Sequence, residues 1–121
     1  MGLVGLFIFN DKKTAPDTDN LVFQTDKVRE GRIAQIDSAM VGDYTRANKL
    51  CILGIRDSSN NDDYINFRKA TQYYQVHLVG QLYLYGGERL IGIVESPTAS
   101  DVCYFSVHGK EYDGLPVTRG D

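Results

Sequence analysis

The residues best suited to bind a metal ion lie in one polar stretch, between positions 57 and 63. Side chains with oxygen ligands stand there at alternating positions: Asp57, Ser59, Asn61 and Asp63. Alternating oxygen ligands are typical of a calcium-binding loop. An EF-hand also needs a glycine and a bidentate glutamate at fixed positions, where this chain has Asp62 and Arg68. We therefore expect a solvated hairpin loop without a bound metal.

Nucleophilic catalysis would need a serine or a cysteine beside a histidine. The chain has two histidines, His77 and His108, and two cysteines, Cys51 and Cys103. It contains no GxSxG motif, and a spacing of five along a strand places Cys103 and His108 on opposite faces. No CxxC spacing suggests zinc. We expect no enzyme, no cofactor and no small-molecule substrate, while the sequence leaves open whether the two cysteines pair.

Phosphate binding is the last chemistry that a motif suggests. Gly86-Gly87 interrupts an apolar run, but neither GK[ST] nor a helical pattern follows it, so we expect a hairpin turn. A net charge of −3 and a pI of about 5.3 argue against nucleic-acid binding, because that affinity depends on basic side chains. Residues 1–9 are apolar but lack a basic n-region and are too short to cross a bilayer, so we expect no signal peptide and no membrane span.

The elements that would position these residues read as short strands. Tyr73 to Tyr112 holds three or four alternating runs, separated by Gly86-Gly87 and by Ser96 to Asp101. Strict alternation of apolar and polar residues indicates strands that are buried on one face. Val28 to Asp37 alternates as well, and its charges indicate a strand at a sheet edge.

Two further segments complete this pattern. Ser38 to Lys49 reads as a turn or a broad loop, and a short helix is possible there. Leu50 to Arg56 is the most continuously apolar run, which predicts a central strand covered on both faces. Seven to nine short strands with no amphipathic helix of normal length predict an all-β fold. We predict a single antiparallel β-sandwich of jelly-roll type with an extended N-terminal arm.

The predicted arm comprises residues 1–20, and the β-sandwich domain comprises residues 21–121. Leu3 to Phe9 is a strand-like apolar run, whereas Asn10 to Asn20 is polar and without periodicity, like a loop. The apolar run has two interpretations: an edge strand of the domain's own sheet, or an arm that docks on a neighbouring subunit. The arm's candidate protein-interface residues are its large apolar side chains: Leu3, Val4, Leu6, Phe7, Ile8 and Phe9.

Tyrosine is frequent in this chain, with eight residues and no tryptophan. Tyrosine is enriched at protein interfaces, because it offers an apolar ring and a polar tip. Tyr83 and Tyr85 alternate with Leu82 and Leu84. If the leucines fill the core, the two rings form a ladder on the surface that favours a partner. We therefore predict Tyr83 and Tyr85 as further protein-interface residues.

Three segments of the second half of the chain carry a recognisable pattern of strands and turns: Val79 to Leu90, Val94 to Val102 and Ser106 to Glu111. They contain a "G-x-L/I-Y-L" strand, a "TA-x-D" turn and a last strand ending in "x-G-x-E". In these motifs about a third of the chain resembles the C-terminal half of small β-sandwich proteins from tailed bacteriophages. Gly86-Gly87 stands where the pattern often has a proline. Proteins with this pattern occur among virion structural components.

This resemblance implies a non-enzymatic structural protein of a bacteriophage virion, either a capsid decoration protein or a component of the head–tail connector or neck. Such a protein would be made in the host bacterial cytoplasm. It would bind itself as a homo-oligomer and other virion proteins, without nucleic acid or a membrane. The alternative is a small carbohydrate-binding module, in which tyrosines stack on sugar rings and the loop from Asp57 to Asp63 binds calcium.

Overall fold

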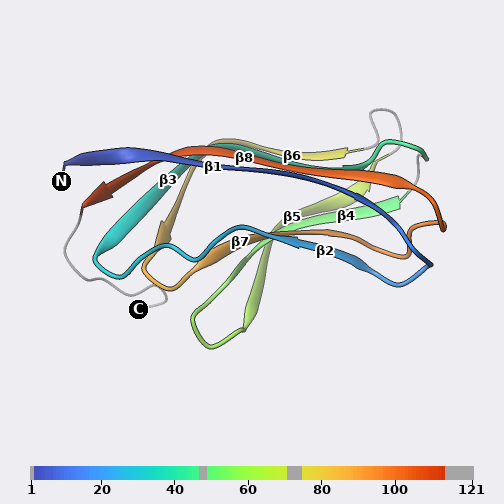
Figure 1. Ribbon diagram of the computed structural model, residues 1–121, viewed down its shortest axis with the longest axis horizontal. Coiled ribbons are helices and arrows are strands. Elements are labelled where there is room, and N and C mark those ends of the chain that lie inside the picture. The colour runs from blue at the N-terminus through green and yellow to red at the C-terminus, as the bar shows by residue number, and fades with distance from the viewer. Residues whose placement is uncertain (1, 47–48, 71–74, 114–121) are drawn as a thin grey trace.

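The chain folds into eight strands (Figure 1). The computed structural model describes the backbone of residues 2–46, 49–70 and 75–113, and the side chains of residues 2–46, 49–63 and 82–113. The strands are β1 (Leu3–Thr14), β2 (Leu21–Gln24), β3 (Arg32–Asp43), β4 (Lys49–Arg56), β5 (Asp62–Ala70), β6 (Gln75–Tyr85), β7 (Arg89–Val94) and β8 (Val102–Asp113). Within these described ranges there is no helix, and so none that could cross a membrane.

Two four-stranded antiparallel sheets form a β-sandwich, which confirms the predicted fold class. The first sheet has the order β1-β8-β3-β6 and the second the order β2-β7-β4-β5. Figure 1 shows them as an upper and a lower layer. The antiparallel pairs β1·β8, β2·β7, β3·β6 and β4·β5 alternate between the two sheets. This nested pairing is the one expected for an eight-stranded jelly roll.

The core lies between the sheets and is built from the inward residues of each alternating strand. Phe105 on β8 is its centre, with Phe23 of the opposite sheet at 5.6 Å between ring centroids and Phe9 of β1 at 5.8 Å. Phe23 and Phe105 are fully buried. Burying an aromatic side chain stabilises the fold by roughly 2–3 kcal/mol. The two ring contacts made by Phe105 therefore connect β8 with β1 and with β2.

The N-terminal segment is an edge strand of this sandwich, which is the first of its two interpretations. β1 pairs with β8 from Leu3 opposite Tyr112 to Thr14 opposite Val102. The predicted loop from Asn10 therefore begins only after Thr14. Residues 10–14 read as a loop because they lie at a sheet edge with one face in solvent, where polar side chains are tolerated. The N-terminal arm is thus not a separate extension, since residues 3–14 lie in the same sheet as β8.

The third strand also differs from the sequence prediction. β3 begins at Arg32, runs on to Asp43 and lies between β8 and β6, so it is not an edge strand. The charged residues Arg29 and Glu30 precede the strand, and a β-bulge between Ile36 and Ser38 shifts its register. A bulge interrupts strict alternation, so the segment from Ser38 reads as a turn or loop in the sequence although Ser38 to Asp43 belong to β3.

The predicted central strand is confirmed. β4 lies between β7 and β5, and all residues from Cys51 to Ile55 are buried. Cys51, Leu53 and Ile55 belong to the core between the sheets, whereas Ile52 packs with Ile91 and Ile93 of β7 in a second apolar cluster. Because apolar residues cover both faces of this strand, it reads as a continuous apolar run.

Candidate functional site

The outward side of β1 carries four large apolar residues that are exposed to solvent. The exposed fractions are 63% for Leu3, 44% for Val4, 69% for Leu6 and 50% for Ile8. None of the residues from Leu3 to Phe9 is charged, whereas Asp11, Lys12 and Lys13 follow in the same strand. We call Leu3, Val4, Leu6 and Ile8 the β1 stripe. An exposed apolar stripe on an edge strand is a place where another chain can bind.

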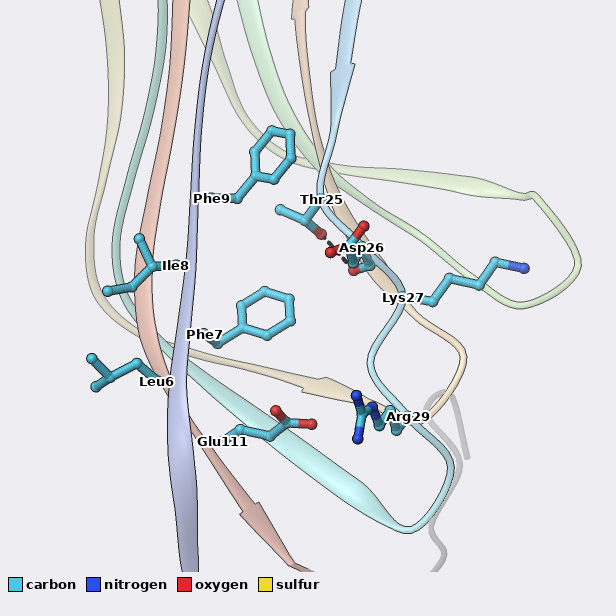
Figure 2. A pocket seen from close by; sticks show the side chains of 9 residues that line it. All are labelled: Leu6, Phe7, Ile8, Phe9, Thr25, Asp26, Lys27, Arg29 and Glu111. Atoms are coloured by element: carbon cyan, nitrogen blue, oxygen red, sulfur yellow. Dashed lines mark hydrogen bonds between the residues drawn. The ribbon is translucent and has the colours of Figure 1, made fainter.

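Phe7 and Phe9 point to the other side of β1. They pack against the core between the sheets, as Figure 2 shows for the two rings on the side of β1 opposite to Leu6 and Ile8. The structure therefore divides the six predicted interface residues of this segment between two faces. Alternation assigns Val4, Leu6 and Ile8 to one face and Phe7 and Phe9 to the other. Leu3 is also exposed because a β-bulge between Leu3 and Gly5 shifts the register of β1 against β8.

Tyr83 and Tyr85 lie on β6, at the far edge of the first sheet. Cross-strand pairs place Tyr83 in one row with Gln35, Lys110 and Leu6, so that both tyrosines share the outer face with the β1 stripe. Tyr83 is exposed and Tyr85 is half-buried, while Leu84 between them is buried in the core. Tyr83 and Tyr85 therefore lie on the outer face of the sheet, as predicted, but β8 and β3 separate them from β1.

Two further residues of the outer face were missed by sequence reasoning. Ile33 on β3 and Tyr112 on β8 lie in one cross-strand row with Leu3 and Tyr85, and both are half-buried. They extend the apolar character of this face across the sheet. Alternation within each strand could have assigned their faces, but only the order β1-β8-β3-β6 brings the four side chains together.

A cavity of about 190 Å³ opens beside β1 (Figure 2). It lies between Phe7 and Phe9 on one side and the segment from Thr25 to Arg29 on the other, at the edge where the two sheets separate. This segment is fixed by backbone hydrogen bonds, because Val28 N–H donates to the Glu88 carbonyl at 2.8 Å. The Thr25 hydroxyl accepts from Leu90 N–H at 3.1 Å and is buried. The cavity walls are therefore held in place.

Charged side chains surround the two phenyl rings of this cavity. They are two acids and two bases: Asp26, Lys27, Arg29 and Glu111. Figure 2 shows the Glu111 carboxylate and the Arg29 guanidinium on opposite sides of the cavity below Phe7. An apolar floor with a balanced charged rim can hold an apolar group that carries polar edges. No motif in the sequence marked this site, since its residues come from three separate segments.

A buried pair of carboxylates, Asp43 and Asp101, lies at another end of the sandwich. Asp43 Oδ1 accepts hydrogen bonds from the backbone N–H groups of Thr45 at 2.9 Å and Arg46 at 3.0 Å. Asp101 accepts from Arg46 Nε at 2.9 Å and from Thr98 N–H at 3.0 Å. The pair therefore connects the loop after β3 with the loop before β8. Asp101 is the aspartate of the "TA-x-D" turn, whereas no motif in the sequence marked Asp43.

The two carboxyl groups of this pair titrate differently. Burial and a hydrogen bond to Asp101 raise the pKa of Asp43 to about 6. Burial also acts to raise the pKa of Asp101, but hydrogen bonds from Asp43, Thr98 and Arg46 and the charge of Arg46 together hold it below its usual value. The shared proton of the pair consequently resides on Asp43. Both groups are fully buried, so the pair acts on stability rather than on a substrate.

The other candidate chemistries have structural roles. Asp57 Oδ1 accepts from the backbone N–H groups of Ser59 at 2.8 Å and Asn61 at 2.9 Å, and these bonds lower its pKa. The carboxylate thus closes its own turn. Among the described side chains, no three His, Cys, Asp or Glu residues form a group that could hold a metal ion. Gly87 has a φ of 86° and lies in the hairpin turn that is closed by Glu88 N–H donating to the Tyr85 carbonyl.

The cysteines and His108 lie apart, as their strand positions predict. Cys103 is buried in the core and His108 is exposed on the outer face. Cys51 and Cys103 are free thiols, and burial raises their pKa to about 11 and about 12. His108 Nε2 lies 3.1 Å from the Ser106 hydroxyl, which donates its hydrogen bond to Asn10 instead. His77 belongs to β6, but its side chain lies outside the described residues.

Comparisons with known proteins bear on the fold. No protein-family model and no curated protein sequence matches the chain. A similar solved structure is the pre-peptidase C-terminal domain of a collagenase from Bacillus anthracis, with 11% identity over 88% of this chain and 90% of that one and a TM-score of 0.51. The NLP core from Drosophila has 15% identity over 87% and 97% of the two chains, with a TM-score of 0.46. The likeness to the collagenase domain shows the fold alone.

Proposed function

We propose that this chain is a non-enzymatic structural protein of a bacteriophage virion that works through protein–protein assembly. The observation that carries the proposal is the β1 stripe, a charge-free apolar surface on a long edge strand. The protein would serve as a capsid decoration protein or as part of the head–tail connector. The resemblance of residues 79–111 to small phage proteins supports the virion part of the proposal, and the structural comparisons do not contribute to it.

The β1 stripe favours binding for a simple energetic reason. Fully burying an aliphatic side chain of this size stabilises a complex by roughly 1.5–3 kcal/mol, and four of them lie together here. Soluble proteins usually protect edge strands by keeping them short or by placing charges on them. β2 follows this rule, since it has four residues and Lys13 Nζ donates to its Val22 carbonyl at 2.9 Å. Residues 3–9 of β1 have neither protection.

The proposal is tested by the solution mass of the full chain and of a Leu6→Asp variant, measured by light scattering at equal concentrations. We expect an oligomer for the wild-type chain and a monomer for the variant, because a carboxylate cannot be buried in an apolar contact without a large cost. Lys12→Asp, at an exposed polar position on the same face beyond the apolar residues, is the control and should leave the oligomer intact. Deleting residues 1–20 would be uninformative, since it removes a strand of the sandwich.

A virion role makes a separate demand. The chain should be present in intact particles of its phage in many copies, as counted by quantitative mass spectrometry of purified virions. If the chain forms an oligomer but is absent from particles, the assembly part of the proposal is supported and the virion role is refuted. A wild-type chain that is monomeric and absent from particles would refute both parts.

A small carbohydrate-binding module is the second candidate function. The observation that favours it is the cavity beside β1, because phenyl rings next to charged side chains can hold a sugar ring and its hydroxyl groups. A glycan screen with the wild-type chain and a Phe7→Ala variant tests this candidate. Binding that the variant loses, by a monomeric wild-type chain, would favour the module over the virion protein.

A further inference from the structure

The charge-free half of β1 is complementary to itself in one antiparallel register. In an antiparallel pair, side chains that stand directly opposite each other share a face. If two copies of β1 pair around a two-fold axis at Leu6, Leu6 meets Leu6, Val4 meets Ile8 and Gly5 meets Phe7. Val4, Leu6 and Ile8 then contact their counterparts, and the inward residues stay on the inward side. Leu3 precedes the β-bulge between Leu3 and Gly5 and lies outside this regular pairing.

Polarity selects this centre over its neighbours. In the regular part of β1, which begins after the β-bulge between Leu3 and Gly5, an axis at Leu6 pairs residues 4–8 and leaves Asn10, Asp11 and Lys12 beyond the paired segment. An axis at Phe7 would place the polar Asn10 against Val4, and an axis at Ile8 would place Lys12 against Val4. Moving the axis towards the N-terminus would shorten the contact. The Leu6 register is therefore the longest regular pairing that contains no polar residue.

The cavity beside β1 fits the same arrangement. Phe7 lines the cavity, and a Cβ built on Gly5 has no atom within 4 Å, so there is open space next to Gly5. In the Leu6 register the Phe7 of the second copy stands opposite Gly5, on the same inward face as this space. The two acids and two bases of the rim balance each other, so that they add no net repulsion between the copies.

We propose that two copies of this protein pair through β1 around a two-fold axis at Leu6, which joins their first sheets into one continuous eight-stranded sheet. This inference rests on the proposed assembly function and names the partner of the β1 stripe as a second copy of the chain. A two-fold contact of this kind is isologous, because the same residues contribute from both sides.

Disulfide trapping in the full chain tests the register. In a Leu6→Cys variant the two introduced thiols would lie opposite each other, within the reach of a disulfide after small adjustments. Val4→Cys and Ile8→Cys should form few dimers separately, whereas a mixture of the two should form the cross-linked heterodimer. We expect at least about tenfold more covalent dimer from Leu6→Cys than from either neighbour alone. Lys12→Cys is the control for random collisions, and the native Cys51 and Cys103 are buried.

Each outcome decides the question. Reducible dimers of Leu6→Cys together with the mixed Val4→Cys and Ile8→Cys dimer support the pairing. Equal cross-linking of Ile8→Cys alone would overturn the Leu6 axis. If the wild-type chain is oligomeric by light scattering but Leu6→Cys forms no dimer, self-pairing of β1 is refuted while the assembly function stands. A monomeric wild-type chain without cross-links would refute both.

Discussion

Replacing Asp43 by asparagine should make the protein more stable at neutral pH and leave its stability unchanged in acid. Asp43 Oδ1 accepts two backbone hydrogen bonds and Oδ2 is buried, so an amide can keep the acceptor and donate from the second atom towards Asp101. The amide of the Asp43→Asn variant would thus imitate the protonated carboxyl group. It cannot ionise, so it would not place a second negative charge beside Asp101.

The sign and size of this effect follow from the pKa of Asp43. Folding raises this pKa from 3.8 to about 6, so the folded state binds the proton more tightly than the unfolded state does. The stability contributed by this group is complete below pH 4 and is lost as the pH rises through 6. One pKa unit corresponds to about 1.4 kcal/mol, so the loss amounts to about 3 kcal/mol at pH 7.5. The asparagine variant should not suffer this loss.

Urea unfolding of both proteins between pH 3.5 and pH 7.5 measures the effect. We expect equal unfolding midpoints near pH 4 and a higher midpoint for Asp43→Asn above pH 6, with unchanged slopes. Asp19→Asn removes the same formal charge from an exposed loop and serves as the control. A stability difference that does not depend on pH, or a variant that is less stable at neutral pH, would refute the shared proton.

Two further predictions concern the core. Gly109→Ala should destabilise the fold by about 3 kcal/mol or prevent folding, as measured by thermal melts. The reason is that a Cβ at Gly109 would overlap the backbone carbonyl oxygen of Gln35, which cannot move away. Gly2→Ala is the control and should be neutral, because a Cβ there meets no atom. The buried thiols of Cys51 and Cys103, with their raised pKa, should react with a thiol reagent only after unfolding. Rapid labelling of the native protein at pH 8 would contradict their burial.

The type of the fold was predictable because alternation is a local property. A few residues of sequence are enough to indicate which side chains are buried. Examples are the alternation of Leu82 and Leu84 with Tyr83 and Tyr85, and the continuous apolar run of β4. These patterns indicated the β-sandwich and the faces of most strands. They failed where a strand lies at an edge, as for residues 10–14 of β1, or where a bulge changes the register, as after Ile36 in β3.

The candidate site could be predicted only in part. The apolar composition of Leu3 to Phe9 was enough to predict an interface segment. Its division into the β1 stripe and the inward Phe7 and Phe9 depends on pairing with β8. The cavity could not be foreseen, since Glu111 reaches it from β8 and Arg29 from the segment before β3. The Asp43–Asp101 pair likewise joins positions far apart in the sequence, and no local pattern reports such contacts.

The pairing of β1 with β8 has a consequence for how the protein is made. Leu3 lies opposite Tyr112, so the first strand finds its partner only after nearly the whole described chain has been synthesised. Translation proceeds at about 5–20 residues per second, and β1 therefore waits on the order of 5–20 s with its backbone edges and apolar side chains unpaired. Contacts between such distant residues also form slowly. During this interval a nascent chain on a crowded polysome could pair with the β1 of its neighbour, and the same strand would then need protection by a chaperone until β8 emerges.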